Sequence, residues 1–193
     1  MFKGTSASAG IGIGKAVIVE EAELVITRNE VADAEAEIQR FKGALEKTIA
    51  ATQKMADDLA SRVGEKEAEI MQGHMMLLSD PMLTGEIENS VKNDKVNCEF
   101  AIENVCNMYA DMFASMGDEL MQQRATDMRD IKVRMQRTLM GLESVDVSLL
   151  PKGSILVAKD LPPSMTAGIN PENVSGIVTE LGGKTSHSAI LAR

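Results

Sequence analysis

Hydrophobic residues recur at two different periods along this chain, and the period changes twice. Between Glu30 and about residue 143, apolar residues return every three or four positions, which is the spacing of one face of an α-helix. On either side, short apolar runs at 15–19, 155–158 and 174–179 are typical of buried strands. The pattern therefore predicts a helical stretch that is set between strands.

The predicted helices end at glycines or at turn residues. The first helix ends near Gly64 and the second at Leu78. Asp80 and Pro81 then suit the N-cap and the first helical position of a third helix. Asn97 is placed to cap a fourth, and the pair at 117–118 separates it from a fifth. Residues 30–143 are thus predicted to form antiparallel helix hairpins.

Methionines dominate the apolar stripes of the fourth and fifth predicted helices. In the fourth, the stripe consists of Ala101, Val105, Met108, Met112 and Met116. We predict that these stripes belong to the core. The alternative is that some of them face outward as an adaptable binding groove, because the flexible side chain of methionine suits that role.

The order of the elements predicts an α+β protein of two domains. Residues 1–25 and 145–193 would form a small α/β domain, and residues 30–143 would form a helical domain that interrupts it. Three strands and a final helix of barely two turns are close to the limit of independent stability. We therefore expect the α/β domain to be incomplete at its C-terminus, and the sequence to be a fragment of a longer protein.

Composition and charge narrow the class of function. The chain is 44% hydrophobic but 3% aromatic, and its net charge is −9. Proteins that bind nucleic acids need basic surfaces, so we expect no nucleic-acid partner. The sequence has no apolar run of membrane-spanning length and no signal peptide at its start, so we expect a cytoplasmic protein without a membrane partner.

Cysteine and histidine usage argues against a disulfide and against a metal site. Cys98 and Cys106 lie eight positions apart on a predicted helix, a separation of roughly 12 Å that is too great for a disulfide. We expect both to be buried thiols. The chain has two histidines and no clustered Cys/His spacing, so no protein metal site is predicted.

The last dozen residues carry the clearest chemical signal. The predicted strand at 174–179 leads into Gly182-Gly183, where the backbone can approach a ligand without obstruction by a Cβ atom. Thr185 and Ser186 suit a helix N-cap, which puts His187 in a first helical turn. Unpaired N–H groups and the helix dipole favour an anion there, and neutral imidazole is a usable nucleophile. We interpret His187 as a phosphoryl carrier; the alternative is a polar cap with an incidental histidine.

A second glycine-rich stretch precedes the first predicted strand. Gly10, Gly12, Gly14 and Lys15 suggest a nucleotide-binding loop, but their spacing fits neither the Walker A nor the dinucleotide-binding pattern. We interpret this stretch as a glycine-rich turn before a buried strand.

The closing Gly-Gly-x-Thr-Ser-His-x-Ala-Ile-x-Ala-Arg resembles the phosphohistidine motif of the phosphoenolpyruvate-utilising enzymes. Within that superfamily, the helical insert with Gly73-His74-Met-Met-Leu-Leu78 and Arg124-Ala-x-Asp127-x-Arg129-Asp130-Ile131 is similar to enzyme I of the sugar phosphotransferase system. The glycine-rich N-terminus also looks like that of enzyme I. The resemblance covers the whole chain.

The resemblance implies a function in phosphoryl transfer. In enzyme I the phosphoryl group passes from phosphoenolpyruvate to a histidine, matched here by His187, and then to the phosphocarrier HPr, which docks on the helical domain. Phosphoenolpyruvate and Mg²⁺ bind a C-terminal (β/α)-barrel domain that also dimerises. That domain is absent from this sequence, so no cofactor is expected here and the fragment alone should be inactive with phosphoenolpyruvate.

The resemblance also implies roles for other residues. Thr166 matches a hydroxyl close to the imidazole, although it could simply cap a helix. Residues expected to support the phosphate or the imidazole are Gly182, Gly183, Thr185, Ser186 and Arg193. Of these, Arg193 could equally form a structural ion pair. Residues expected at the HPr-binding surface are Ile70, His74, Leu77, Met82, Phe113, Arg124 and Arg129. His74 lies among methionines on a predicted helix, where a partly buried histidine is the default interpretation.

Two other functions remain possible from the residues alone. The chain could contain the phosphohistidine swivelling domain of a pyruvate phosphate dikinase or a phosphoenolpyruvate synthase. It could also be a non-catalytic helical interaction module in which the histidine is idle.

Overall fold

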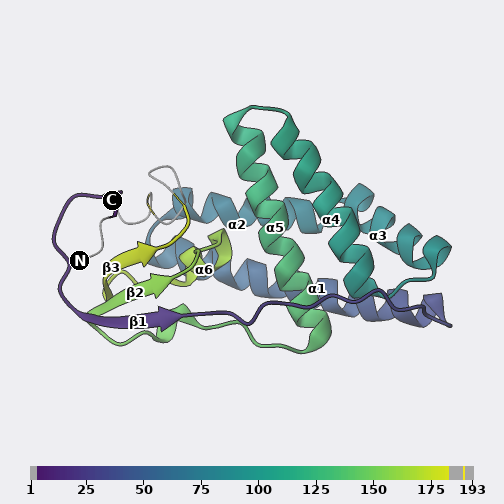
Figure 1. The fold of residues 1–193 in the computed structure, drawn as a ribbon, viewed down its shortest axis with the longest axis horizontal. Helices are drawn as coiled ribbons and strands as arrows, with labels where there is room; N and C mark the ends of the chain where they lie inside the picture. The colour runs from purple at the N-terminus through teal and green to yellow at the C-terminus, as the bar shows by residue number, and fades with distance from the viewer. Residues whose placement is uncertain (1–3, 183–188, 190–193) are drawn as a thin grey trace. The chain divides into compact units, whose positions relative to one another are not determined.

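A computed structural model describes residues 4–182 and residue 189. The chain divides into two compact units, one formed by Met1–Ala22 with Val145–Arg193 and the other by Glu23–Ser144. The described elements are mostly helical, with a small parallel sheet of three strands (Figure 1). The predicted α+β fold class is therefore confirmed.

The described part of the Glu23–Ser144 unit contains five helices. They are α1 (Ala34–Arg62), α2 (Glu65–Leu78), α3 (Pro81–Asp94), α4 (Cys98–Ser115) and α5 (Glu119–Met140). Short polar side chains start several of them, because the first N–H groups of a helix lack partners within it. The carboxylate of Asp80 accepts from the Met82 amide at 2.8 Å, with Pro81 in the first turn as predicted. Gly141 ends α5 with a φ of 66°, a left-handed conformation that favours glycine.

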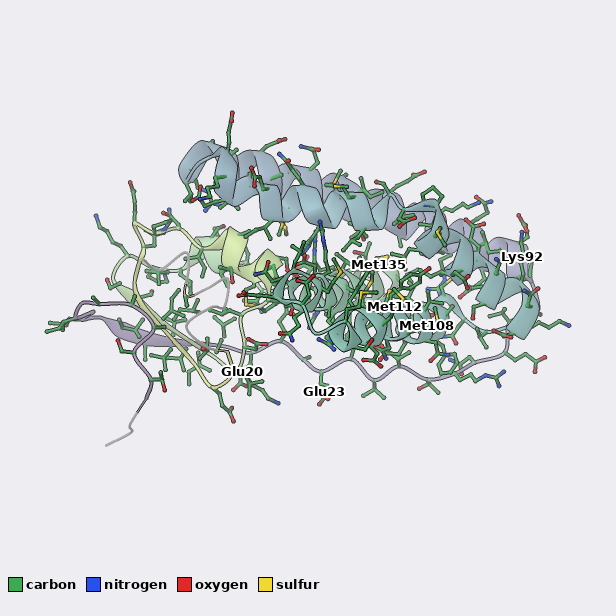
Figure 2. All side chains as sticks on the ribbon, turned by 90° about the horizontal axis from the view of Figure 1, so that it is seen from above. Glu20, Glu23, Lys92, Met108, Met112 and Met135 are labelled. Carbon is green, nitrogen blue, oxygen red and sulfur yellow. The ribbon has the colours of Figure 1, made fainter. Side chains whose placement is uncertain are left out.

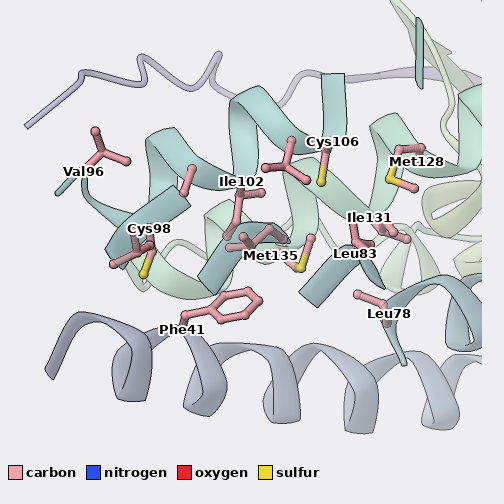
Figure 3. Close-up of a cluster of buried hydrophobic side chains, with 14 of the residues drawn as sticks. Phe41, Leu78, Leu83, Val96, Cys98, Ile102, Cys106, Met128, Ile131 and Met135 are labelled. Carbon is pink, nitrogen blue, oxygen red and sulfur yellow. The ribbon is translucent and has the colours of Figure 1, made fainter. Parts of the chain in front are cut away.

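Apolar side chains from all five helices form one core in this unit. Phe41 of α1 and Ile102 of α4 are almost completely buried, as are Leu83 of α3 and Ile131 of α5 (Figure 3). Leu78, the last residue of α2, completes the cluster. Each such side chain contributes roughly 1.5–3 kcal/mol on burial. The hairpins are therefore held together mainly by aliphatic packing, as the low aromatic content indicated.

The prediction that the methionine stripe of α4 is core was wrong for its C-terminal half. Met108, Met112 and Met116 are 53%, 43% and 54% exposed. Figure 2 labels Met108 and Met112 on α4, and Met135, which is buried, on α5. The buried face of α4 is instead lined by Ala101, Ile102, Val105, Cys106 and Ala110. Both faces of α4 are apolar, so periodicity could not tell which one packs.

An extended segment before α1 pairs with the connection between α3 and α4. The Val31 amide donates to the carbonyl of Lys95 at 2.9 Å, and the Asn97 amide donates to the carbonyl of Asn29 at 3.0 Å. This pairing explains why α1 begins at Ala34 and not at Glu30 as predicted. Asn97 does precede α4, but its side chain accepts from the Asn29 amide and does not cap the helix.

The sheet lies in the other unit and contains β1 (Lys15–Val19), β2 (Ser154–Ala158) and β3 (Val174–Thr179). The strands are parallel in the order β1-β2-β3, and Val17 pairs with Leu156, which pairs with Ile177. Helix α6 (Pro163–Gly168) connects β2 to β3, and a 3-10 turn (Val147–Leu149) precedes β2. All three strands were predicted, whereas the 3-10 turn was not. The small core of this unit centres on the fully buried Leu156.

The glycines before β1 have a packing role. A Cβ atom on Gly14 would meet the carbonyl oxygen of Gly153, and one on Gly12 would meet that of Ser175. Backbone atoms yield less readily than the end of a flexible side chain, so both positions favour glycine. Close packing of the N-terminal segment against the start of the sheet therefore explains these glycines without a nucleotide.

Candidate functional site

The carboxyl ends of β2 and β3 lie at the same edge of the sheet because the strands are parallel and adjacent. Pairing continues past β3, where the Leu181 amide donates to the carbonyl of Lys159 at 2.8 Å. Gly182 follows with a φ of 101°, which a residue with a side chain rarely adopts. Ligands of open α/β sheets bind outside the carboxyl ends of the strands. The segment that carries His187 therefore begins at the edge where a ligand is expected.

Most of the predicted phosphate-binding residues lie outside the described part of the chain. These are Gly183, Thr185, Ser186, His187 and Arg193. Their roles stay predictions. Ala189, two residues after the histidine, is helical and 5% exposed.

Thr166 lies in α6, after the carboxyl end of β2, and is 4% exposed. Its hydroxyl is within 3.1 Å of the carbonyl oxygen of Pro162 and 3.3 Å of that of Leu161. Since a carbonyl only accepts, the hydroxyl hydrogen is used there, and the lone pairs of Oγ1 keep their capacity to accept. Oγ1 of Thr166 can therefore accept a hydrogen bond from an N–H donor, and its predicted role beside the imidazole stays a prediction.

The predicted partner-binding residues are spread over four helices of the helical unit. Ile70 and Leu77 of α2 are half-buried, as are Phe113 of α4 and Arg124 of α5. Met82 of α3 is 70% exposed. These five side chains therefore have surface that a partner could contact.

Arg129 of α5 is also exposed. Its Nη2 lies 3.8 Å from Oδ1 of Asp111, which is on α4. Solvent-exposed pairs at this separation are weak, so Arg129 can exchange this partner for another at little cost.

His74 has no exposed surface. Its Nε2 lies 3.3 Å from Oδ1 of Asp127, and its Nδ1 lies 4.0 Å from Oδ2 of Asp130. Because a carboxylate only accepts, Nε2–H is the donor when Asp127 is ionised. A direct contact between this ring and a partner would require α2 and α5 to separate. The position of His74 suits a role beneath the surface, where it joins the two helices.

The sequence did not predict that three charged side chains of α5 are buried. Asp127, Asp130 and Arg134 are 7%, 5% and 8% exposed. Nη2 of Arg134 donates to Oγ1 of Thr52 on α1 at 2.7 Å. Burial lowers the pKa of Arg134, and the charge of Asp130 acts in the opposite direction. The acids at 127 and 130 are one helical turn apart, and this spacing was the available signal for a shared inward face.

A shallow groove lies between α1 and α2. Three of its lining residues are acidic, namely Asp57, Glu65 and Glu69. Among the described residues, no group of histidine, cysteine and carboxylate side chains is arranged to hold a metal ion. No described helix combines the length and apolarity that crossing a membrane would need.

Comparison with known proteins assigns the chain to a class. Residues 3–124 match the family described as "PEP-utilising enzyme, N-terminal", and residues 150–193 match "PEP-utilising enzyme, mobile domain". Two solved structures are similar over almost the whole chain. The NMR solution structure of Enzyme I (nEIt) gives a TM-score of 0.87 at 38% identity, covering 100% of this chain and 79% of that one. The N-terminal domain of Enzyme 1 – Nitrogen gives 0.68 at 26% identity, covering 97% and 77%.

Curated relatives agree with this class. The phosphoenolpyruvate-protein phosphotransferase of Bacillus subtilis is 40% identical over 192 residues, and that of Listeria monocytogenes is 42% identical. Each comparison covers 100% of this chain but 34% of the relative. The fold and the two matched segments define an N-terminal part of the PEP-utilising enzymes. The chain belongs to the PEP-utilising enzymes, and within them it corresponds to the N-terminal part of enzyme I.

Proposed function

We propose that this chain is the phosphoryl-transfer module of an enzyme I, in which His187 carries the phosphoryl group between phosphoenolpyruvate and HPr. The observation that carries the proposal is the full-length similarity to phosphoenolpyruvate-protein phosphotransferases, which includes the mobile-domain match over residues 150–193. The relatives favour this function over that of a dikinase or an idle helical module.

The proposed chemistry uses the ring of His187 as a nucleophile. A lone pair on Nε2 attacks the phosphorus of phosphoenolpyruvate, a P–N bond forms, and the P–O bond breaks to release the enolate of pyruvate. In the second step a nucleophile on HPr attacks the same phosphorus, and the P–N bond breaks. The other ring nitrogen must hold its proton so that Nε2 keeps its lone pair. We propose that Oγ1 of Thr166 accepts a hydrogen bond from that N–H group and so fixes the tautomer.

The carboxyl edge of the sheet would hold the phosphoryl group through the backbone. Gly182 and Gly183 would bring amide groups close to the phosphate oxygens, and Thr185 and Ser186 would add hydroxyl donors. Arg193 would supply a fixed positive charge. These donors would stabilise an anion, and we propose no metal ion for this part of the protein.

The helical unit would bind HPr through the exposed parts of α2, α3, α4 and α5. Met82 would supply an apolar contact that is already 70% exposed, and Arg124 and Arg129 would supply cationic groups. The acidic groove between α1 and α2 would attract a basic partner. His74 would act beneath this surface by keeping α2 against α5.

Other properties of the whole enzyme belong to this proposal. The chain spans 34% of the length of the curated relatives. We propose that the phosphoenolpyruvate site, its Mg²⁺ and the dimer interface lie in the remainder of the full-length protein. The absence of a membrane-spanning helix among the described residues is compatible with a proposed location in the cytoplasm.

Transfer of labelled phosphate from phosphorylated HPr to the full-length protein tests the proposal. The wild-type protein should acquire an acid-labile, base-stable label, and His187→Ala should lose it. The matched control is His74→Gln, which keeps a donor for Asp127 and should retain the label. Label that persists in His187→Ala would contradict the assignment, as would a folded wild-type protein that never acquires it.

A further inference from the structure

Gly73 lies in the interior of α2, where glycine is costly. A glycine inside a helix destabilises it relative to alanine, because the free chain loses more conformational entropy on folding. Nothing at this position requires a left-handed backbone, since Gly73 is absent from the residues with positive φ. The reason for this glycine must therefore lie in what surrounds it.

The guanidinium of Arg124 occupies the space that a side chain at position 73 would fill. A Cβ atom built on Gly73 would lie 2.9 Å from Nη1 of Arg124 and 3.9 Å from its Cζ. Arg124 belongs to α5, which packs against α2 (Figure 1). The bare backbone of α2 at Gly73 thus forms a seat for the charged end of Arg124.

The seat lies within the predicted partner-binding face. Ile70 and Leu77, at three residues before and four after Gly73, lie on the same side of α2 and are half-buried. Directly after Gly73, the buried His74 contacts Asp127, which is three residues after Arg124 in α5. Two adjacent residues of α2 therefore contact one turn of α5. His74 contacts Asp127 in the interior, and Gly73 lies against the guanidinium of Arg124.

We propose that Gly73 is a positioning residue for partner binding: by leaving room beside α2, it lets the guanidinium of Arg124 lie against that helix, where it can donate to an acceptor oxygen of the phosphocarrier. The inference rests on the proposed function, because it assigns a use to Arg124 that needs a partner on this face. Within the described part of the chain, no hydrogen bond or ion pair occupies the Arg124 guanidinium. Its donors are thus available, and an arginine that already occupies its bound position loses less side-chain entropy on binding.

The substitution Gly73→Ala separates this role from a purely structural one. The atom that meets the new methyl group is the end of a flexible side chain, so the guanidinium moves at little cost to the fold. The helix itself gains, because alanine is the better helix former. If Gly73 serves only the packing of α2 against α5, Gly73→Ala should lower the melting temperature and leave binding normal. A positioning role predicts an unchanged or higher melting temperature with weakened binding.

The experiment uses the full-length protein with HPr as the varied substrate. We expect Gly73→Ala to raise the KM for HPr about tenfold. Phosphorylation by phosphoenolpyruvate in the absence of HPr should be unchanged. In an Arg124→Ala background the same substitution should have no further effect on KM. The matched control is Gly43→Ala in α1, where a Cβ atom meets nothing within 4 Å, so KM should not change.

Three outcomes would overturn the inference. A normal KM in Gly73→Ala would show that Arg124 does not depend on its seat. An equal rise in KM in the Arg124→Ala background would show that the methyl group blocks the partner directly. An unchanged NMR resonance of the Arg124 Nε–H group in Gly73→Ala, measured without HPr, would refute the contact itself. If the wild-type protein does not use HPr at all, the proposed function is wrong. The NMR measurement, which needs no HPr, still tests the contact between Gly73 and Arg124.

Discussion

At the scale of single residues, the structure shows pairs of buried polar groups that the hydrophobic pattern of the sequence did not predict. The resemblance placed His74 near the partner surface and its position among methionines favoured a partly buried ring; the ring is in fact fully buried, with Asp127 as its partner. A single histidine among methionines gives no sign of its partner, because Asp127 is 53 positions away in the sequence. The pairing depends on how two helices pack, and local spacing cannot specify that.

Removing the carboxylate of Asp127 should destabilise the helical unit. Asp127→Ala leaves Nε2 of His74 buried without its partner, and we expect a loss of about 1–3 kcal/mol in the free energy of unfolding. Urea denaturation followed by circular dichroism measures this loss. The control is Asp111→Ala, whose carboxylate is exposed and lies 3.8 Å from Arg129, and it should change stability by less than about 0.5 kcal/mol. Equal effects of the two substitutions would refute the buried pairing.

The two cysteines should be unreactive while the protein is folded. Burial raises the pKa of both Cys98 and Cys106 to about 12, with the charge of Glu37 adding to the effect at Cys98. Thiolate is the reactive form, so at pH 8 a disulfide reagent such as DTNB should react with both thiols only after denaturation. The free, buried thiols of the structure match the prediction from their spacing. Fast reaction of either thiol with the folded protein would contradict this account.

At the scale of elements, an arginine of α1 joins that helix to the start of α4. Arg40 donates to Glu37, also of α1, at 2.7 Å and to Glu99 of α4 at 2.8 Å. The hydrogen bond from Arg40 lowers the pKa of Glu37. Burial alone would raise the pKa of Glu99, but its hydrogen bonds, chiefly that from Arg40, outweigh burial and lower it.

The cluster of Arg40, Glu37 and Glu99 should make the free energy of unfolding depend on pH in the acid range. A carboxyl group whose pKa is lower in the folded state contributes stability above its unfolded pKa, near 4.5, and loses it as the pH falls through the folded value. Arg40→Met should therefore lower stability at pH 7 and reduce the further loss below about pH 4.5. Urea denaturation at a series of pH values measures both. The control is Lys42→Met, which removes the exposed cation that lies 3.3 Å from Glu88; exposed pairs are weak, so the acid dependence should change little.

The N-terminal segment should tolerate substitution at one glycine and not at another. Gly14→Ala places a methyl group against the carbonyl of Gly153 just before β1, and we expect a loss on the order of 2 kcal/mol in the stability of the α/β unit. Gly4→Ala meets nothing within 4 Å and should have little effect. Thermal unfolding of the two variants provides the comparison. Equal stability of both would mean that the segment does not pack as described.

Element types were predictable from the sequence because their signals are local. Asp80-Pro81 marks the start of α3, and the run at 174–179 coincides with β3. The start of α1 and the buried face of α4 were not predictable in the same way. The first depends on pairing with residues 95–97, and the second on which of two apolar faces meets α5. Both are decided by tertiary contacts.

At the scale of the whole molecule, the sequence was enough to recognise the site, but it did not predict how the residues around the site are arranged. The family was predictable because His187 and its neighbours form a dense motif within a strand–turn–helix pattern. The described residues supply the sheet edge, the left-handed Gly182 and the buried Thr166. The contact between Gly73 and Arg124 could not be predicted, since it depends on the conformation of a side chain from another helix.

The most direct test of the central claim is the location of the phosphoryl group. The full-length protein would be incubated with phosphoenolpyruvate and Mg²⁺, quenched at alkaline pH and digested, and the phosphopeptide identified by mass spectrometry. The account predicts one phosphohistidine at His187 that disappears when unphosphorylated HPr is added. Phosphate on His74 or on a hydroxyl residue, or a label on His187 that HPr cannot remove, would contradict it.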